Sequence, residues 1–362
     1  MKIIKWIHRL NSRRIASLLT VNLMIKKPLF ILRVLQRIVY EKSTGKCRFW
    51  SVLFATHYKC VLNCAHCYEK SFFRTNKSSL TTDEKIKILK NCLKEGILTF
   101  DFIGGESFLD KEFPKLIKSC SPHKSHIAVS TNGFLLDEEK IKAYQRLGVD
   151  KLNISLDSWF RVEHDKNRGV EGAYEKAMAT IDICQKCNMN LSINFVVYNG
   201  TTKTESFRRI VDFAVKRKIK LTFLAAVPLG RCENKKEIII SEEDKDNMQQ
   251  WHEKYPFLSR NCVQKCPICP AFSKLFAISA YGDVMPCDFI HISFGNLKNE
   301  SLHLILKRVN EFDKIKGKGI GCIPAEDIDF INRYLPHICA ADPYPITVQA
   351  LLEKKGSDVN DN

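Results

Sequence analysis

Long hydrophobic runs are missing from this sequence of 362 residues. No stretch reaches the ~18 consecutive apolar residues that a membrane-spanning helix needs. The longest uncharged stretch near the start, Ile15–Ile25, is interrupted by Ser17, Thr20 and Asn22, and we find no pattern of a secretory signal. Glycine and proline are also scarce, at 16 and 12 residues, which excludes collagen-like and low-complexity proteins. We expect a globular cytoplasmic protein.

Acidic residues are the scarcer charged class. Asp and Glu number 40 against 57 Lys and Arg, which gives a net charge of +17. Residues 1–42 hold ten of the basic residues and one acid, Glu41, so this segment alone carries +9. A charge of this size and sign indicates an anionic partner, which could be nucleic acid, a lipid surface or an acidic substrate.

The basic segment 1–42 is expected to form two helical pieces separated by Pro28. In the second piece, Arg33 and Arg37 share one face beside a large apolar surface. We interpret this arm as a peripheral membrane contact. The alternative is a helical cap that packs on the next domain with its basic face in water. A nucleic-acid arm is the least favoured interpretation, because interleaved base-stacking aromatic residues are lacking.

The fifteen cysteines are an odd number and follow no secretory signal. In a reducing compartment, clustered thiols more often bind metals than form disulfides. Cysteine clusters are therefore treated as candidate metal ligands.

Between residues 50 and 230, short β-branched or aromatic runs alternate with amphipathic helical stretches. Strict alternation predicts parallel β/α units, whose functional groups gather at the carboxyl ends of the strands. We expect an α/β fold: a partial (β/α)6 barrel of the TIM type over residues 49–240. A basic helical arm (1–48) precedes it, and a small cysteine-rich domain (241–355) and a tail (356–362) follow. The expected strands are Ser51–Thr56, Leu98–Ile103, His126–Ser130, Lys151–Leu156, Leu191–Val197 and Lys220–Ala226.

Three cysteines, Cys60, Cys64 and Cys67, stand within eight residues directly after the first expected strand. Structural zinc sites normally take four ligands in two separated pairs, so this spacing fits zinc poorly. Iron–sulfur clusters are held by cysteine thiolates, usually four. Three ligands on a four-iron cluster leave one iron open, and an open coordination position is typical of a catalytic metal centre.

The spacing of three and then two residues between these cysteines resembles the radical S-adenosylmethionine (radical SAM) family. The resemblance implies a [4Fe-4S] cluster on Cys60, Cys64 and Cys67, whose open iron binds SAM. Gly104-Gly105-Glu106 follows the second strand and resembles the glycine-glycine-glutamate segment that holds the SAM amino group. Glycines allow a close backbone approach, and a carboxylate matches an ammonium group.

Further SAM contacts are implied by the same resemblance after the third and fourth strands. Asn132 lies in a Thr-Asn-Gly segment common in the family. Ser155 is implied to contact the ribose or carboxylate region of SAM, with Asp157 assisting. Arg168 matches an arginine that pairs with the SAM carboxylate. None of these residues is assigned as a catalytic acid or base.

The C-terminal cysteines resemble the start of a SPASM or Twitch auxiliary-cluster region. Cys269 precedes Gly282 by twelve intervening residues, and Cys287 follows Gly282 after four more. We expect a hairpin with Gly282 in its turn. Later SPASM cysteines are missing, so we expect one auxiliary iron–sulfur cluster, with a zinc knuckle as the alternative. The expected ligands are Cys269, Cys287, Cys322 and Cys266, followed by Cys262 and Cys339 as other choices for the fourth.

The resemblance implies that a one-electron reductant, such as a flavodoxin or ferredoxin, drives cleavage of SAM. The 5′-deoxyadenosyl radical so formed then removes hydrogen from an unactivated C–H bond of a second substrate. A lipid or isoprenoid-type substrate at the membrane surface is favoured, because of the basic arm. The alternatives are a SPASM-type peptide or protein maturase, an RNA-modifying enzyme and a non-catalytic iron–sulfur electron carrier.

Overall fold

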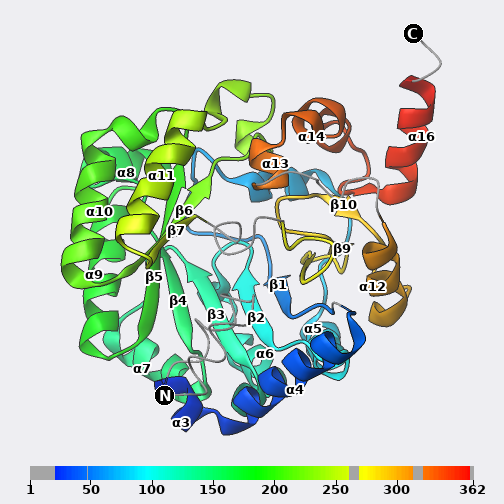
Figure 1. Cartoon of the computed structure of the whole chain (residues 1–362), viewed down its shortest axis with the longest axis horizontal. Coiled ribbons are helices and arrows are strands. Elements are labelled where there is room, and N and C mark those ends of the chain that lie inside the picture. Colours follow the sequence, from blue (N-terminus) through cyan, green and yellow to red (C-terminus); the bar gives the residue numbers. More distant parts are fainter. Residues whose placement is uncertain (1–20, 47, 261–268, 313–320, 359–362) are drawn as a thin grey trace.

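A computed structural model describes residues 21–46, 48–260, 269–312 and 321–358. Within them, six parallel strands alternate with helices along the chain and curve into a partial barrel (Figure 1). The expected strand positions are confirmed, because both ends of each strand agree to within one residue. These strands are β1 (Ser51–Ala55), β2 (Thr99–Ile103), β3 (His126–Thr131), β4 (Lys151–Ser155), β5 (Asn190–Val197) and β6 (Lys220–Ala225).

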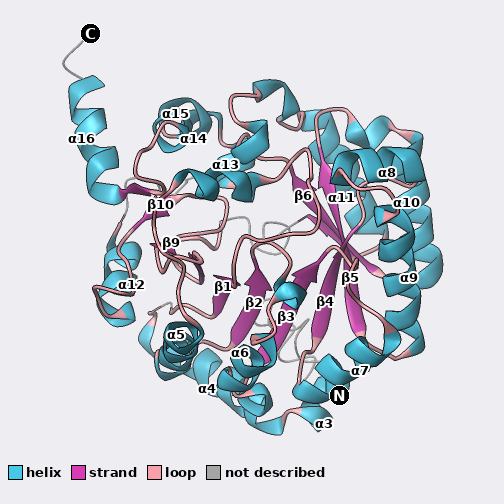
Figure 2. Cartoon of the chain, turned by 180° about the vertical axis from the view of Figure 1, so that it is seen from behind, coloured by secondary structure: helices cyan, strands magenta, loops and turns pink. Residues whose placement is uncertain are grey.

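Helices cover the outer face of the sheet (Figure 2). Local sequence signals set their ends. The helix after β1 begins at a capping box, in which Thr81 and Glu84 each bind the other's backbone N–H. The barrel helices are α5 (Thr82–Lys94), α6 (Phe113–Ser119), α7 (Glu138–Leu147), α8 (Arg161–Arg168), α9 (Ala173–Lys186), α10 (Glu205–Arg217) and α11 (Glu242–Lys254).

The sheet continues past residue 240, where the sequence predicted that the β/α alternation ends. After α11, strand β7 (Leu258–Arg260) pairs parallel to β6. On the other side, β8 (Leu275–Ile278) pairs parallel to β1 and turns into the antiparallel β9 (Val284–Met285). The strand order is β7-β6-β5-β4-β3-β2-β1-β8-β9, so β7 and β9 form the two edges and the barrel stays open between them.

The remaining C-terminal elements are short. Strands β10 (Ile292–Ser293) and β11 (Ile346–Thr347) form a separate parallel pair. The helices are α12 (Leu302–Glu311), α13 (Ile323–Glu326), α14 (Ile328–Arg333), α15 (Leu335–Cys339) and α16 (Val348–Asp358). Short 3₁₀ helices span Tyr68–Arg74, Ser107–Leu109, Pro122–Lys124, Thr201–Lys203, Gly230–Cys232 and Lys236–Ile238.

The two faces of the barrel strands differ in chemistry. Positions that face the helices are apolar and fully buried, as for Phe100 and Phe102 on β2 or Leu152 and Ile154 on β4. Alternate positions face the barrel interior, and many of these are small or polar. TIM-type barrels usually fill this space with bulky branched side chains. Here the described residues enclose a cavity inside the barrel, and its lining includes Ser51, Thr99, Asp101, His126, Ala128, Ser130, Lys151, Asn153, Ser155, Asn194, Lys220 and Thr222.

The described part of the N-terminal arm forms α3 (Val21–Lys26) and α4 (Pro28–Thr44), which confirms the break at Pro28. Helix α4 lies across the amino ends of the strands (Figure 1). Phe30, Val34 and Ile38 are buried against Trp50 and Leu98. No described helix is long and apolar enough to span a membrane.

Both interpretations of the arm expected Arg33 and Arg37 to present a free basic face. The structure shows that they do not. Arg33 donates to the carbonyl oxygens of Lys124 and Ile97, at 2.7 and 3.1 Å. Arg37 is buried and donates to the carbonyl oxygens of Phe49 and Gly96, at 3.0 and 2.7 Å. That expectation is wrong for these two residues, because loop carbonyls at the amino ends of the strands lie within reach of their long side chains. The packing agrees with a helical cap.

Two valines on α4 test whether this helix is an integral cap. Val34 is fully buried, whereas Val39 is 62% exposed. We expect Val34→Ala to lower the free energy of unfolding by about 2 kcal/mol, through lost burial and the cavity left behind. The same change at Val39 should stay within about 0.5 kcal/mol of wild type. Urea unfolding curves measure both, and equal effects would contradict the docked cap.

Candidate active site

The barrel interior forms one cavity of about 1200 Å³. Ligand pockets usually measure about 300–1,000 Å³, so this cavity has room for more than one small ligand. The thiols of Cys60, Cys64 and Cys67 line its wall beyond the carboxyl end of β1, and Cys287 lines the side formed by the C-terminal region. The cavity therefore connects the two cysteine groups that the sequence singled out.

The loop that carries the three cysteines is held by backbone contacts to neighbouring strand ends. The N–H of Asn63 donates to the carbonyl oxygen of Arg168 at 2.9 Å, and that of Ala65 to Asn167 at 2.8 Å. Arg231 donates to the carbonyl oxygens of Asn63 and Cys64 at 2.7 and 3.2 Å. These contacts come from the end of α8 and from the segment after β6, so the barrel itself fixes the cysteine loop.

Glycines make this close packing possible. Gly105, Gly169 and Gly230 each lie so near the cysteine loop that an added Cβ would clash with its backbone. The carbonyl oxygens in the way belong to Lys59, Asn63 and Cys67, respectively. The sequence predicted that Gly104 and Gly105 approach a ligand; both do line the cavity, but their close contacts are to the cysteine loop.

Glu106 is buried and is not among the residues that line the cavity. Its carboxylate accepts hydrogen bonds from the Thr131 hydroxyl and the Asn132 N–H, all at 3.0 Å, and from the Phe108 N–H at 3.4 Å. The side chain is fully buried, and burial raises its pKa to about 7 although these hydrogen bonds favour the charged form. Glu106 ties the end of β2 to that of β3, and its contact with a SAM amino group stays a prediction.

Asp157 and Arg168 form a buried ion pair behind the cysteine loop. Arg168 Nε lies 2.6 Å from Asp157 Oδ2, and Nη2 donates to Oδ1 at 2.7 Å. Burial disfavours both charges, yet the attraction to Arg168 keeps the pKa of Asp157 below its usual value. Arg168 Nη1 donates to Cys64 Sγ at 3.7 Å. The guanidinium fork expected to meet the SAM carboxylate is thus largely occupied by Asp157.

His66, inside the cysteine motif, joins this group. Its Nε2 lies 3.6 Å from Asp157 Oδ2. Burial lowers the pKa of His66 more strongly than the Asp157 charge raises it, so the ring is neutral at pH 7. The sequence reasoning did not assign His66 a role, although its position between two expected ligands was a usable signal.

Most of the predicted cofactor-binding residues reach the same cavity. Asn132 and Ser155 line it, as do Arg168, Gly104 and Gly105, whereas Glu106 and Asp157 lie behind its wall. The Asn132 side-chain amide also lies 3.7 Å from Cys60 Sγ. The structure therefore brings residues from the ends of β2, β3 and β4 together around the cysteine loop.

The three thiols fit an iron–sulfur cluster by their chemistry and surroundings. Cys60 is exposed to the cavity and Cys64 and Cys67 are partly exposed. Among the described residues, no three His, Cys, Asp or Glu side chains converge on a single metal ion. Burial raises the pKa of Cys67 to about 12, so a ligand role requires a metal to displace its proton. Three thiols spread around one cavity wall suit a larger cluster better than a lone ion.

The structure describes four of the six C-terminal cysteines proposed as auxiliary ligands. Cys269, Cys287, Cys322 and Cys339 are all buried, whereas Cys262 and Cys266 lie outside the described residues. Cys287 donates to Asp288 Oδ1 at 3.1 Å and borders the cavity. The ligand set of an auxiliary cluster stays a prediction.

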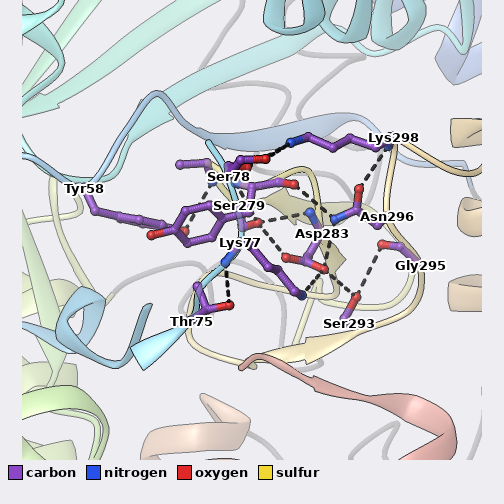
Figure 3. Close-up of polar contacts among 12 residues, drawn as sticks. Tyr58, Thr75, Lys77, Ser78, Ser279, Asp283, Ser293, Gly295, Asn296 and Lys298 are labelled. Carbon is purple, nitrogen blue, oxygen red and sulfur yellow. Dashed lines mark hydrogen bonds and ion pairs between the residues drawn. The ribbon is translucent and has the colours of Figure 1, made fainter. Parts of the chain in front are cut away.

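A polar network fixes the hairpin that leads to Cys287 (Figure 3). The buried Asp283 pairs with Lys77 at 2.9 Å and accepts from Ser279 and Asn296 at 3.1 and 3.2 Å. Lys77 belongs to the segment that follows the cysteine loop. Gly282 lies in the turn with φ 93°, as expected. The network thus holds the two cysteine groups in a fixed relation.

Family comparisons match two segments of the chain. Residues 55–214 match the radical SAM superfamily, and residues 269–339 match the SPASM iron-sulfur cluster-binding domain. The chain contains a radical SAM domain followed by a SPASM domain. The radical SAM match runs from the last residue of β1 into α10, and the SPASM match runs from Cys269 to Cys339. The expected family and auxiliary region are confirmed.

Relatives of this radical SAM chain differ in chemistry. GTP 3′,8-cyclase of Clostridium perfringens (strain SM101 / Type A) is 31% identical over 190 residues, which are 51% of this chain and 57% of that protein. AdoMet-dependent heme synthase of Methanosarcina barkeri is 22% identical over 292 residues, covering 71% of this chain and 82% of that protein. The chain thus spans little more than half the length of the cyclases.

Solved structures confirm the partial barrel. Streptococcus suis SuiB bound to its precursor peptide SuiA has a TM-score of 0.59 at 15% identity, over 78% of this chain and 69% of that one. Native anSMEcpe with bound AdoMet also has a TM-score of 0.59, at 21% identity over 74% of this chain and 84% of that one. At these identities the likeness concerns the fold.

Gly230 provides a test of the packed cysteine loop, with Gly200 as its matched control. Both have positive φ, +60° and +79°, but an added Cβ clashes with Cys67 only at Gly230, whereas Gly200 has open space. Alanine should cost both sites a similar ~1–2 kcal/mol of backbone strain. After anaerobic reconstitution we expect Gly230→Ala to lose most iron at the cysteine loop and Gly200→Ala to retain it. Equal iron content would contradict the packing argument.

Proposed function

We propose that the chain is an enzyme that reductively cleaves SAM and uses the resulting radical to remove hydrogen from a C–H bond of a second substrate. The observation that carries this proposal is the single cavity bounded by the three thiols of the cysteine loop. When bound there, a [4Fe-4S] cluster supplies the electron that splits SAM into methionine and a 5′-deoxyadenosyl radical. A flavodoxin or ferredoxin would serve as reductant.

The chain's own residues would hold the reactants and exclude water. Cys60, Cys64 and Cys67 would bind the cluster. Asn132 and Ser155 line the adjacent wall and offer hydrogen bonds to the polar groups of SAM. Arg168 and Asp157 act together: their ion pair holds the guanidinium of Arg168 against the Cys64 thiol, one of the three that would bind the cluster.

The second substrate would occupy the rest of the cavity. Peptides are one candidate class, because SuiB and anSMEcpe, which share this fold, are seen with bound peptides. A lipid at a membrane surface is the second candidate class of substrate, and it is supported only by exposed apolar residues of the arm. These are Ile25, Leu29, Leu32 and Val39. The basic residues that first suggested a lipid partner include Arg33 and Arg37, which the barrel carbonyls bind.

SAM cleavage tests the proposal directly. We expect the reconstituted protein, reduced with dithionite without oxygen, to form 5′-deoxyadenosine from SAM, and Cys64→Ala to form none above background. Cys187→Ala is the matched control, because Cys187 is also partly exposed but lies at the end of α9, outside the cavity lining. Chromatography of the nucleoside products measures all three. Wild-type activity in Cys64→Ala would refute the cluster assignment.

Cys287 separates the roles of the two cysteine groups. We expect Cys287→Ala to keep cleaving SAM while losing modification of the second substrate, because the auxiliary cluster would handle only the substrate's electron. Iron and sulfide analysis should show about four of about eight irons lost. A Cys60/Cys64/Cys67 triple alanine variant should lose the other four. Full substrate turnover by Cys287→Ala would rule out the auxiliary role.

A further inference from the structure

Exposed apolar side chains gather on the outer face of the N-terminal helices. Ile25 on α3 is 76% exposed, and Leu29, Leu32 and Val39 on α4 are 46%, 50% and 62% exposed. The last three follow one another at spacings of three and seven residues, which places them along one face of α4. We call Leu29, Leu32 and Val39 the α4 stripe.

The grouping of these side chains matters more than the exposure of any one of them. Of the nine large hydrophobic side chains that are exposed among the described residues, four lie between residues 25 and 39. The other five stand on five separate elements: Phe73, Leu109, Val162, Leu304 and Ile328. Single exposed apolar residues are ordinary in globular proteins, whereas a contiguous group marks an interaction surface.

The α4 stripe faces away from the barrel. The opposite side of α4 carries Phe30, Val34 and Ile38, which are buried against Trp50 and Leu98. A helix that buries one face in its own domain normally presents polar residues on the other face. Because α4 presents leucine and valine there, a partner that removes these side chains from water gains free energy.

The two N-terminal helices carry one acidic residue. Glu41 is the only Asp or Glu of residues 21–46. Its Oε1 accepts hydrogen bonds from Trp50 Nε1 at 2.6 Å and from the Arg48 N–H at 3.2 Å. The charge of Glu41 is therefore met by donors next to β1.

Basic residues are more numerous around the α4 stripe. Lys26 and Lys42 are exposed on α3 and α4, and Arg48 is exposed just beyond them. Residues 1–20, which directly precede α3, add five Lys and Arg and no acid. The two arginines of α4 that bind loop carbonyl oxygens are not needed for this excess. The outer face of the arm is therefore both apolar and basic.

We propose that the α4 stripe binds the surface of a lipid bilayer that contains anionic lipids. The apolar side chains enter the boundary between headgroups and acyl chains, and the neighbouring Lys and Arg lie among the headgroup phosphates. A nucleic acid would bind the basic groups and leave the apolar ones in water. A second copy would cover the stripe but set two basic helices against each other. An anionic bilayer accounts for both features.

This surface goes beyond the proposed function, because it concerns where the enzyme is held rather than its reaction. Helix α4 lies across the amino ends of the strands, whereas Cys60 follows the carboxyl end of β1 (Figure 1). A bilayer on α4 therefore contacts the end of the barrel that is remote from the cysteine loop. Such contact does not itself require a lipid as the second substrate.

Vesicle binding tests the α4 stripe without any turnover. The reconstituted full-length protein is sedimented with vesicles of phosphatidylcholine alone or of phosphatidylcholine mixed with phosphatidylserine. We expect binding to the mixed vesicles to be at least about tenfold stronger and to weaken as salt is added. In Leu32→Ser/Val39→Ser, the binding constant for mixed vesicles should fall at least about tenfold, because two inserted apolar side chains are lost.

Leu304→Ser/Ile328→Ser is the matched control. Both residues are 56% exposed, but they lie on α12 and α14. Helix α14 is on the opposite side of the molecule from α4 in both views (Figure 1 and Figure 2). We expect this variant to bind mixed vesicles within about twofold of wild type. Urea unfolding curves should match wild type for both variants, because all four side chains are exposed.

Three results would overturn the proposal. The first is wild-type vesicle binding by Leu32→Ser/Val39→Ser, or an equal loss in the control variant. The second is no binding to either vesicle, with single-stranded RNA bound through the stripe instead. The third is a dimer, seen by sedimentation velocity without lipid, that the stripe variant alone dissociates. SAM cleavage measured in solution should be unchanged in both variants, so a failure of the proposed function would be seen separately.

Discussion

The whole site depends on how closely the cysteine loop packs against the strand ends. Gly105, Gly169 and Gly230 come from the loops after β2, α8 and β6, and each leaves no room for a Cβ. Because these glycines stand on different loops, the cysteine loop can take this position only when the barrel has curved around it. The position of the three thiols therefore depends on the curvature of the barrel.

The same barrel has little side-chain packing in its interior, which leaves space for the cavity. Its inward positions hold small or polar residues such as Ala128 and Asn153, so the stability must come from the outer face, where aromatic and β-branched side chains meet the helices. Helix α4 closes the amino ends with Phe30 and Val34. A hollow interior open toward the C-terminal region also explains why Cys287 can border the cavity of a neighbouring domain.

Local patterns predicted the strands, because alternation and β-branched runs act over a few residues. The glycine turns and the helix break at Pro28 follow from local φ preferences in the same way. The partners of long or buried side chains could not be predicted. Arg37 reaches Gly96, and Glu106 turns to Thr131, through contacts that exist only once distant segments have met. The strands of the barrel could thus be predicted from the sequence, whereas the partners of its buried charged side chains could not.

Charge is distributed along the barrel axis in a way that composition alone conceals. Basic residues of the arm, such as Lys27 and Arg33, lie at the amino ends of the strands, where β4 and β6 also begin with a lysine. Several are bound to carbonyl oxygens, yet each keeps its positive charge. The excess of 57 basic over 40 acidic residues then has a structural role, since part of it binds the arm to loop carbonyl oxygens at that end.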